Sequence, residues 1–160
     1  PLICKTGHTF IKQKIRETNA QLGGEMSGHI FFNDRWPGFD DGVYAGARML
    51  EIIANSEKKN IFSDIPNLTS TPEINIPYAD DKKFQIVEKF IQGANFENAR
   101  IIDIDGIRVE FEKGWGLLRA SNTSPVLVLR FEAETESHLD EIKHIFYKNL
   151  NRIDSSFVEF

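Results

Sequence analysis

Residues 102–131 read IDIDGIRVEFEKGWGLLRASNTSPVLVLRF, and this stretch decides the fold of the second half of the chain. Apolar and polar residues alternate on both sides of Asp105-Gly106, a dipeptide typical of a β-hairpin turn. Residues 115–119 and 126–131 supply a third and a fourth strand, joined by residues 121–125. The stretch therefore predicts four mainly antiparallel strands.

Two helical patterns flank these strands. Residues 84–91 carry apolar side chains at helical spacing, and either Asp80 or Asp81 can cap that helix. Residues 137–150 form the second pattern, with an apolar stripe along one side. A four-stranded, mainly antiparallel sheet with two helices on one face is a compact α+β domain.

The first part of the chain predicts alternating strands and helices. Residues 2–4 predict a short strand, residues 10–15 a helix and residues 30–32 another strand. Asp40 and Asp41 can cap a further helix.

Residues 65–80 separate the two parts. They contain three of the six prolines together with several Ser, Thr and Asn residues, a composition that disfavours helices and central strands. We therefore expect a boundary between two domains within residues 65–80.

The composition is that of a globular protein and disfavours several functions. Of the 160 residues, 41% are hydrophobic and 27% charged, and the net charge is −5. Non-specific nucleic-acid binding needs a basic surface, so the acidic balance disfavours it. The sequence has no apolar run long enough for a membrane span and no signal peptide at its start, so we expect a cytoplasmic protein. The single Cys4 cannot build a disulfide framework.

Residues 24–29, Gly-Glu-Met-Ser-Gly-His, form the first segment with candidate chemistry. Glycines on both sides allow the backbone to approach a ligand closely. Glu25 can accept hydrogen bonds from neighbouring hydroxyls, Ser27 can donate or accept them, and His29 can bind a ligand or move a proton. This mixture suits a polyol. A glycine-rich turn with a capping Glu is the alternative interpretation.

Residues 119–125, Arg-Ala-Ser-Asn-Thr-Ser-Pro, form the second such segment. The guanidinium of Arg119 can bind two oxygens of a phosphate. Ser121, Asn122 and Thr123 add hydroxyl, amide and backbone N–H groups, which in a turn can form an anion-binding nest. The alternative is an ordinary turn, because Ser, Thr and Asn are common in turns of every kind.

Two further features carry less information. Lys5 follows the first predicted strand, where a lysine is most often only solvated. Asp103 and Asp105 resemble a metal-binding acidic loop, but Asp105-Gly106 is better explained as a hairpin turn. We therefore assign no metal site in this chain.

Five segments follow one another in an order and spacing that a known family shares. They are residues 5–8 (KTGH), 24–29 (GEMSGH), 35–42 (RWPGFDDG), 70–74 (STPEI) and 114–123 (GWGLLRASNT). Together they resemble the α-D-phosphohexomutase superfamily, and most of all its bacterial phosphomannomutase/phosphoglucomutase branch. Met26 favours this branch, since glucosamine mutases usually carry Gln there.

The resemblance implies a four-domain enzyme, of which this chain is the C-terminal part. Residues 1–67 would be the end of domain 3, an incomplete α/β domain, residues 68–79 a linker, and residues 80–160 the whole of domain 4, which has a TATA-box-binding-protein-like sheet and two helices. Such enzymes move a phosphate group between the C1 and C6 oxygens of a hexose through a phosphoserine. The residues that would bind hexose phosphate are Lys5, Glu25, Ser27, Arg119, Ser121, Asn122 and Thr123. His29 would transfer a proton or position the substrate.

The resemblance also implies that the transfer chemistry lies elsewhere. The family's phosphoserine loop and its Asp-Gly-Asp-Gly-Asp-Arg magnesium loop do not occur in these 160 residues. Mg²⁺ and the hexose 1,6-bisphosphate activator would therefore act in the full-length enzyme, and we expect the chain alone to be inactive. A free-standing, non-catalytic sugar-phosphate binding module is the alternative. A cut through domain 3 would also expose sheet edges through which copies of the chain can associate.

Overall fold

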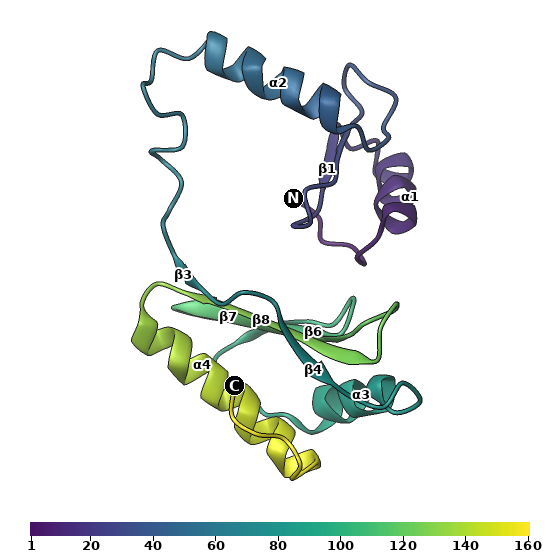
Figure 1. Cartoon of the computed structure of the whole chain (residues 1–160), viewed down its shortest axis with the longest axis vertical. Helices are drawn as coiled ribbons and strands as arrows, with labels where there is room; N and C mark the ends of the chain where they lie inside the picture. Colours follow the sequence, from purple (N-terminus) through teal and green to yellow (C-terminus); the bar gives the residue numbers. More distant parts are fainter. The chain divides into compact units, whose positions relative to one another are not determined.

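The computed structural model describes residues 1–160 and divides them into two units, Pro1–Ile65 and Pro66–Phe160 (Figure 1). Each unit has a hydrophobic core of its own, a small one in the first and a much larger one in the second. None of the helices has the length and apolar character that crossing a membrane requires.

The first unit begins with a helix that packs on a short hairpin. The helix α1 (His8–Thr18) buries Ile11 and Ile15 at helical spacing. The strands β1 (Leu22–Gly24) and β2 (Ile30–Phe32) pair in antiparallel fashion, and β2 contributes the buried ring of Phe31 to the same core. The helix over residues 10–15 and the strand over residues 30–32 are thus confirmed.

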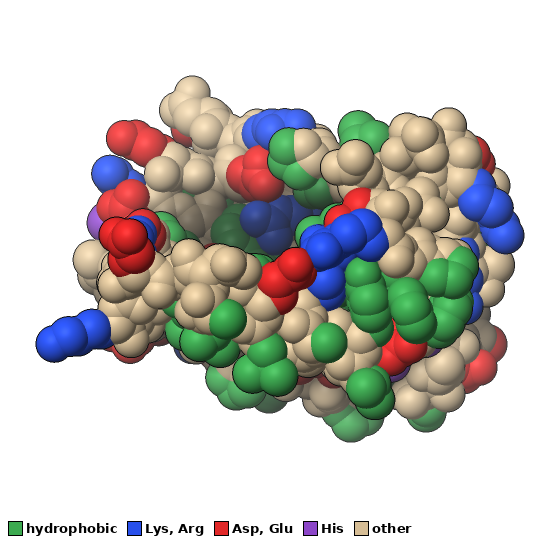
Figure 2. Space-filling view, turned by 90° about the horizontal axis from the view of Figure 1, so that it is seen from above, with side chains coloured by type: hydrophobic (Ala, Val, Ile, Leu, Met, Phe, Trp, Pro, Cys, Tyr) green, Lys and Arg blue, Asp and Glu red, His purple; other side chains and the backbone are tan.

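A second helix, α2 (Gly42–Ala54), follows. The side chain of Asp41 caps it by accepting a hydrogen bond from the backbone N–H of Tyr44 at 2.9 Å, so Asp41 is the cap and Asp40 is not. None of the helix residues is buried, and Val43 and Leu50 are 87% and 67% exposed. Hydrophobic side chains also appear at the molecular surface in Figure 2.

Two expectations for this unit were wrong. Residues 2–4 form no strand, and Leu2 is 70% exposed. A strand needs a partner, and the only paired strands of this unit are β1 and β2, which pair with each other. The strand β1 was not predicted, because two of its three residues are Gly23 and Gly24 and glycine is depleted in strands. The hairpin instead lies so close to α1 that a Cβ on Gly23 would come within 2.9 Å of the Ile11 and Ile15 side chains.

The second unit is an antiparallel sheet of six strands with two helices. Its strands are β3 (Thr69–Ser70), β4 (Ile74–Pro77), β5 (Arg100–Ile102), β6 (Ile107–Phe111), β7 (Gly114–Ala120) and β8 (Val126–Ala133). Their order is β3-β8-β7-β6-β5, and β4 also pairs with β8. Both helices, α3 (Lys83–Gly93) and α4 (Glu136–Ile153), cover the same face of the sheet (Figure 1). The predicted α+β class is confirmed.

The core of the second unit lies between this sheet face and the two helices. Phe146 of α4 is fully buried, and its ring centroid lies 5.4 Å from that of Phe90 on α3 and 5.2 Å from that of Phe131 on β8. A Cβ on Gly116 would come within 2.5 Å of the Phe146 ring, so glycine is required for α4 to approach β7 this closely.

Residues 68–79, predicted as a linker, contain β3 and β4. Both strands pair with β8, with Ile76 opposite Leu127 and Pro77 opposite Val126. Prolines disfavour central strands, but Pro77 ends a strand at the edge of the sheet, where its missing N–H is tolerated. The linker prediction was therefore wrong because composition does not distinguish a linker from an edge strand.

The predicted cap of the first helix of this unit also differs from the structure. The N-cap residue of α3 is Lys82, which makes no side-chain cap, and Asp80 instead forms an ion pair with Lys83 at 2.6 Å. Thr135 caps α4 by accepting from the backbone N–H of His138 at 3.3 Å.

Candidate functional site

The first candidate segment is the turn between β1 and β2. The backbone N–H of Glu25 donates to the carbonyl oxygen of His29 at 3.0 Å, and that of Gly28 donates to the Glu25 carbonyl at 3.0 Å. Gly28 has a φ of 91°, which a residue with a side chain rarely adopts. Closing the turn in this way brings Glu25, Ser27 and His29 together.

The carboxylate of Glu25 links this turn to the segment at residues 5–8. One of its oxygens accepts from the backbone N–H of Gly7 at 3.3 Å, and the other accepts from the hydroxyl of Ser27 at 2.8 Å. Lys5 lies in that same segment, is exposed, and has its Nζ 5.9 Å from the ring centroid of Phe10. The Glu25 carboxylate thus connects residues 24–29 to residues 5–8.

His29 is oriented by Asp40. Its Nδ1 lies 2.7 Å from Oδ2 of Asp40, whose other oxygen accepts from the backbone N–H of Ile30 at 3.1 Å. The hydrogen bond from His29 holds the pKa of Asp40 below its ordinary value. Nε2 of His29 lies 3.8 Å from Glu25, and the ring of His8 meets that of His29 edge-on, with centroids 4.3 Å apart.

The second candidate segment joins β7 to β8. Ser121 is buried, and its hydroxyl accepts from the backbone N–H groups of Thr123 at 3.3 Å and Ser124 at 3.1 Å. Asn122 and Thr123 are exposed. The Ser121 hydroxyl therefore holds the turn in shape while its neighbours face solvent.

Arg119, at the end of β7, has spare hydrogen-bonding capacity. One terminal nitrogen lies 3.8 Å from the carboxylate of Asp105, and its buried Nε has no hydrogen-bond partner. A buried donor without a partner is unusual and needs an explanation. A ligand oxygen that accepts from Arg119 would supply one.

The turn between β5 and β6 packs against β7 next to Arg119. The register pairs Ile102 with Arg108, so the connection is longer than the expected two-residue turn. Gly106 has a φ of 73°, and a Cβ there would lie 2.3 Å from the carbonyl oxygen of Leu118. Asp105-Gly106 is therefore a turn packed against β7, and the Asp105 carboxylate lies 3.8 Å from a terminal nitrogen of Arg119.

Comparisons with known proteins cover almost the whole chain. Residues 1–67 match the family model for phosphoglucomutase/phosphomannomutase, alpha/beta/alpha domain III, and residues 73–149 match the model for the C-terminal domain of the same family. This chain belongs to the phosphoglucomutase/phosphomannomutase family.

Several members of the phosphoglucomutase/phosphomannomutase family are close relatives. The phosphomannomutase/phosphoglucomutase of Pseudomonas aeruginosa PAO1 is 52% identical over 98% of this chain, and the phosphoglucomutase of Neisseria gonorrhoeae is 51% identical over 89%. A solved structure of a family protein from Burkholderia thailandensis covers the whole chain with a TM-score of 0.91 and 45% identity. The chain spans about a third of the length of each of these proteins.

Sequence reasoning missed three polar residues of this family member that hold the candidate segments in place. Asp40 was considered only as a helix cap, and His8 only as part of a motif. Lys83 is 3% exposed and donates from Nζ to the carbonyl oxygen of Ser124 at 2.9 Å. Their roles depend on contacts between residues distant in the sequence, although the motifs at residues 5–8 and 35–42 pointed to two of them.

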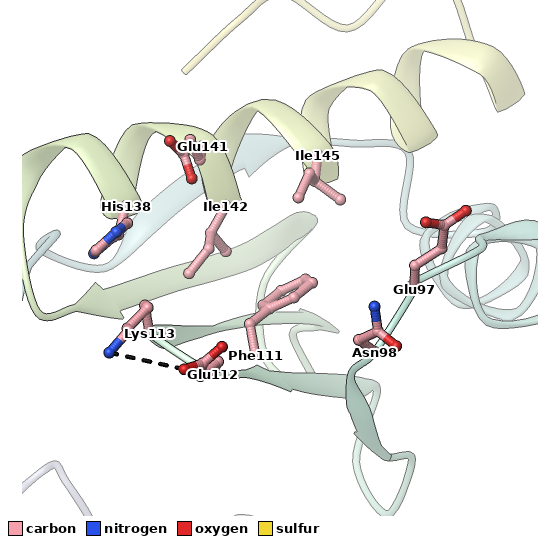
Figure 3. Close-up of a pocket in the computed structure, with 9 residues that line it drawn as sticks. All are labelled: Glu97, Asn98, Phe111, Glu112, Lys113, His138, Glu141, Ile142 and Ile145. Carbon is pink, nitrogen blue, oxygen red and sulfur yellow. Dashed lines mark ion pairs between the residues drawn. The ribbon is translucent and has the colours of Figure 1, made fainter.

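A separate pocket of about 290 Å³ lies in the second unit of this phosphohexomutase relative (Figure 3). It lies between α4, which contributes His138 and Ile142, and the β6–β7 connection, which contributes Glu112 and Lys113. None of the predicted site residues lines it. It is therefore distinct from both candidate segments.

Proposed function

We propose that this chain is the C-terminal part of a phosphohexomutase that moves a phosphate group between the C1 and C6 oxygens of glucose or mannose phosphates. The observation that carries the proposal is the buried, unpartnered Nε of Arg119 beside a turn rich in hydroxyls and amides. Its chemistry suits a phosphate, and the named relatives of this chain are mutases of phosphorylated sugars.

The phosphate that is not transferred would bind at the β7–β8 turn. Arg119 would donate to two of its oxygens, while Asn122 and Thr123, both exposed, would add an amide and a hydroxyl. Ser121 would contribute mainly by ordering the turn through its two backbone acceptor contacts. A fixed anion site of this kind orients the far end of the sugar for reaction.

The sugar hydroxyls would bind at the β1–β2 turn. Glu25 and Ser27 already share a hydrogen bond at 2.8 Å, and both can exchange it for hydroxyls of a ligand. Lys5 would contact the phosphosugar through its exposed ammonium group. His29, oriented by Asp40, would position the substrate or carry a proton. Its Nε2 lies 3.8 Å from Glu25, which is too far for a hydrogen bond, so this nitrogen is available to a ligand.

The transfer itself would need groups from the rest of the full-length enzyme. The phosphoserine loop and the magnesium loop of the family do not occur in this sequence. We therefore propose that Mg²⁺ and a hexose 1,6-bisphosphate activator serve the full-length protein, that this chain alone is inactive, and that the protein works in the cytoplasm without a nucleic-acid partner.

Binding of glucose 1-phosphate by this chain tests the proposed site. We expect the backbone NMR signals of residues 119–124 to shift on titration. Arg119→Ala should weaken binding about 10- to 100-fold, as expected for a lost hydrogen bond to a charged group. Arg130→Ala, on the neighbouring strand β8, is the matched control and should bind like wild type. Unchanged affinity of Arg119→Ala would refute the assignment.

A further inference from the structure

We propose that His8, Glu25 and His29 form a binding site for Zn²⁺ or a similar divalent transition metal ion. Each residue offers one ligand atom, and these atoms all lie within 4.8 Å of one another. Two imidazoles and one carboxylate are a common ligand set of protein-bound zinc that keeps an open coordination position.

One of the three ligand-atom separations is close to that found around a bound metal ion, and all three are within 4.8 Å. Ligand atoms of a tetrahedral zinc site lie about 2.0–2.1 Å from the metal, which puts them about 3.4 Å from one another. Nε2 of His29 and Oε1 of Glu25 are 3.8 Å apart. Side-chain rotations that shorten the separations by up to about 1.4 Å would complete the three-ligand arrangement, with a water molecule as the fourth ligand.

His29 is held in the orientation that metal binding needs. Its Nδ1 lies 2.7 Å from Asp40, and a proton on that nitrogen leaves the lone pair of Nε2 facing Glu25. Carboxylate–histidine–metal arrangements of this kind recur in metalloproteins, because the outer carboxylate fixes the ring and raises its basicity. Asp40 is itself fixed by the backbone N–H of Ile30.

The other two ligands are also restrained. Glu25 accepts from the backbone N–H of Gly7, the residue before His8, so these two ligands are tied to each other. The ring of His8 packs edge-on against the buried ring of Phe31, with centroids 5.2 Å apart. Little ordering is then left to oppose binding.

The donor atoms favour zinc and its neighbours over magnesium. Mg²⁺ prefers an octahedral set of oxygen atoms, whereas imidazole suits Zn²⁺, Cu²⁺ and Ni²⁺. The expectation of no metal in this chain considered only the acidic turn at Asp103 and Asp105. The site proposed here uses Glu25 and His29, which are also assigned to the sugar, so a bound metal ion would compete with the sugar for these side chains. Metal binding can nevertheless be tested without sugar.

Calorimetric titration of the whole chain with Zn²⁺ tests this site. We expect a single ion to bind, and His29→Gln and Glu25→Gln to weaken binding at least about 100-fold. Asp40→Asn, which removes only the outer carboxylate, should weaken it about 10- to 100-fold. His144→Gln is the control, because His144 pairs with Glu159 in the other unit.

NMR of the wild-type imidazole signals provides a second measurement that does not require any variant to fold. Zn²⁺ should shift the signals of His8 and His29 and leave that of His144 unchanged, and Mg²⁺ should shift none of them. No Zn²⁺ binding by the wild-type chain, or binding that leaves the His8 and His29 signals unmoved, would overturn the proposal.

Discussion

Lys83 shows how a single buried cation can support a binding turn that it does not belong to. Its Nζ donates to the Ser124 carbonyl at 2.9 Å and pairs with Asp80 at 2.6 Å, although the side chain is almost fully enclosed. A buried ammonium group is stable only with such partners. Lys83 thus attaches the β7–β8 turn to α3.

Replacing Lys83 with Met should therefore destabilise the second unit. The Ser124 carbonyl and Asp80 both lose a partner, and we expect a loss of about 1–3 kcal/mol in the free energy of unfolding. Urea denaturation of Lys83→Met measures it. Lys89→Met, at an exposed position of the same helix, is the matched control. Equal unfolding midpoints for the two variants would show that the Lys83 contacts contribute nothing.

Asp34 has a similar local role in the first unit. Arg48 of α2 donates to its carboxylate at 2.8 Å, and the guanidinium carbon lies 4.4 Å from the ring centroid of Phe32. The hydrogen bond from Arg48 lowers the pKa of Asp34 from 3.8 to about 2. One charge pair therefore attaches α2 to the end of β2.

The lowered pKa predicts how stability depends on pH. The folded state favours the ionised carboxylate, so this contribution is present above the unfolded pKa of 3.8 and is lost as pH falls through about 2. The stability difference between wild type and Asp34→Asn should accordingly shrink between these two values. Urea unfolding at a series of pH values would reveal it, and a constant difference down to pH about 2 would contradict the assignment.

Among the elements, the β5–β6 hairpin depends most strongly on one residue. Gly106 combines a φ of 73° with a close approach to Leu118 and Arg119 of β7. A Cβ at this position meets backbone atoms, which cannot move aside as a flexible side chain can.

Gly106→Ala should cost at least about 1 kcal/mol of stability, because an alanine in this conformation is strained even without the clash. It should also displace Arg119 and weaken binding of glucose 1-phosphate. Gly93→Ala, at the end of α3 with open space around it, should be neutral or stabilising. Thermal unfolding compares the two, and a stable Gly106→Ala protein would show that the turn can relax.

The helix α2 exposes several large apolar side chains. Val43, Leu50, Ile52 and Ile53 are all about half exposed or more, and no residue of the helix is buried. Exposed apolar faces of this kind mark interaction sites. We propose that the expected association between copies of this chain, through the exposed edges of the first unit, also involves α2.

Leu50→Glu should therefore reduce self-association, because it places a charge in the apolar surface. Val158→Glu changes a residue that is also highly exposed, 78%, but lies in the second unit, and it should have no effect. Sedimentation velocity at increasing protein concentration measures the difference. A wild-type chain that stays monomeric at every concentration would contradict the proposed association.

At the scale of the whole molecule, local signals were sufficient for some features and not for others. The helix at residues 84–91 and the strands of residues 107–131 could be predicted from apolar spacing and one turn dipeptide. The strands β3 and β4 could not, because they exist only through pairing with β8. Such tertiary pairing overrides the composition of a short segment.

Some residues of the candidate site could likewise be predicted from the sequence, and others could not. Motifs identified the turns that carry Glu25 and Arg119, since their residue types suit sugar and phosphate. Asp40 and Lys83 could not be assigned, because their partners lie 11 and 41 residues away in the sequence. Contacts at such separations become visible only when the chain is folded.

At the scale of the whole molecule, substrate binding and phosphate transfer should be separable. This chain would carry the recognition residues for hexose phosphate, and the full-length protein would add the phosphoserine and the metal loop. Without a nucleophile and a metal ion, binding alone should give no turnover.

The most direct test is an assay of glucose 1-phosphate conversion to glucose 6-phosphate with the bisphosphate activator and Mg²⁺. It would compare this chain, the full-length protein that contains it, and the full-length protein with Arg119→Ala. We predict activity for the full-length protein, a loss of about 10- to 100-fold for its variant, and none for the chain alone. Turnover by the 160 residues alone, or an inactive full-length protein, would contradict the account.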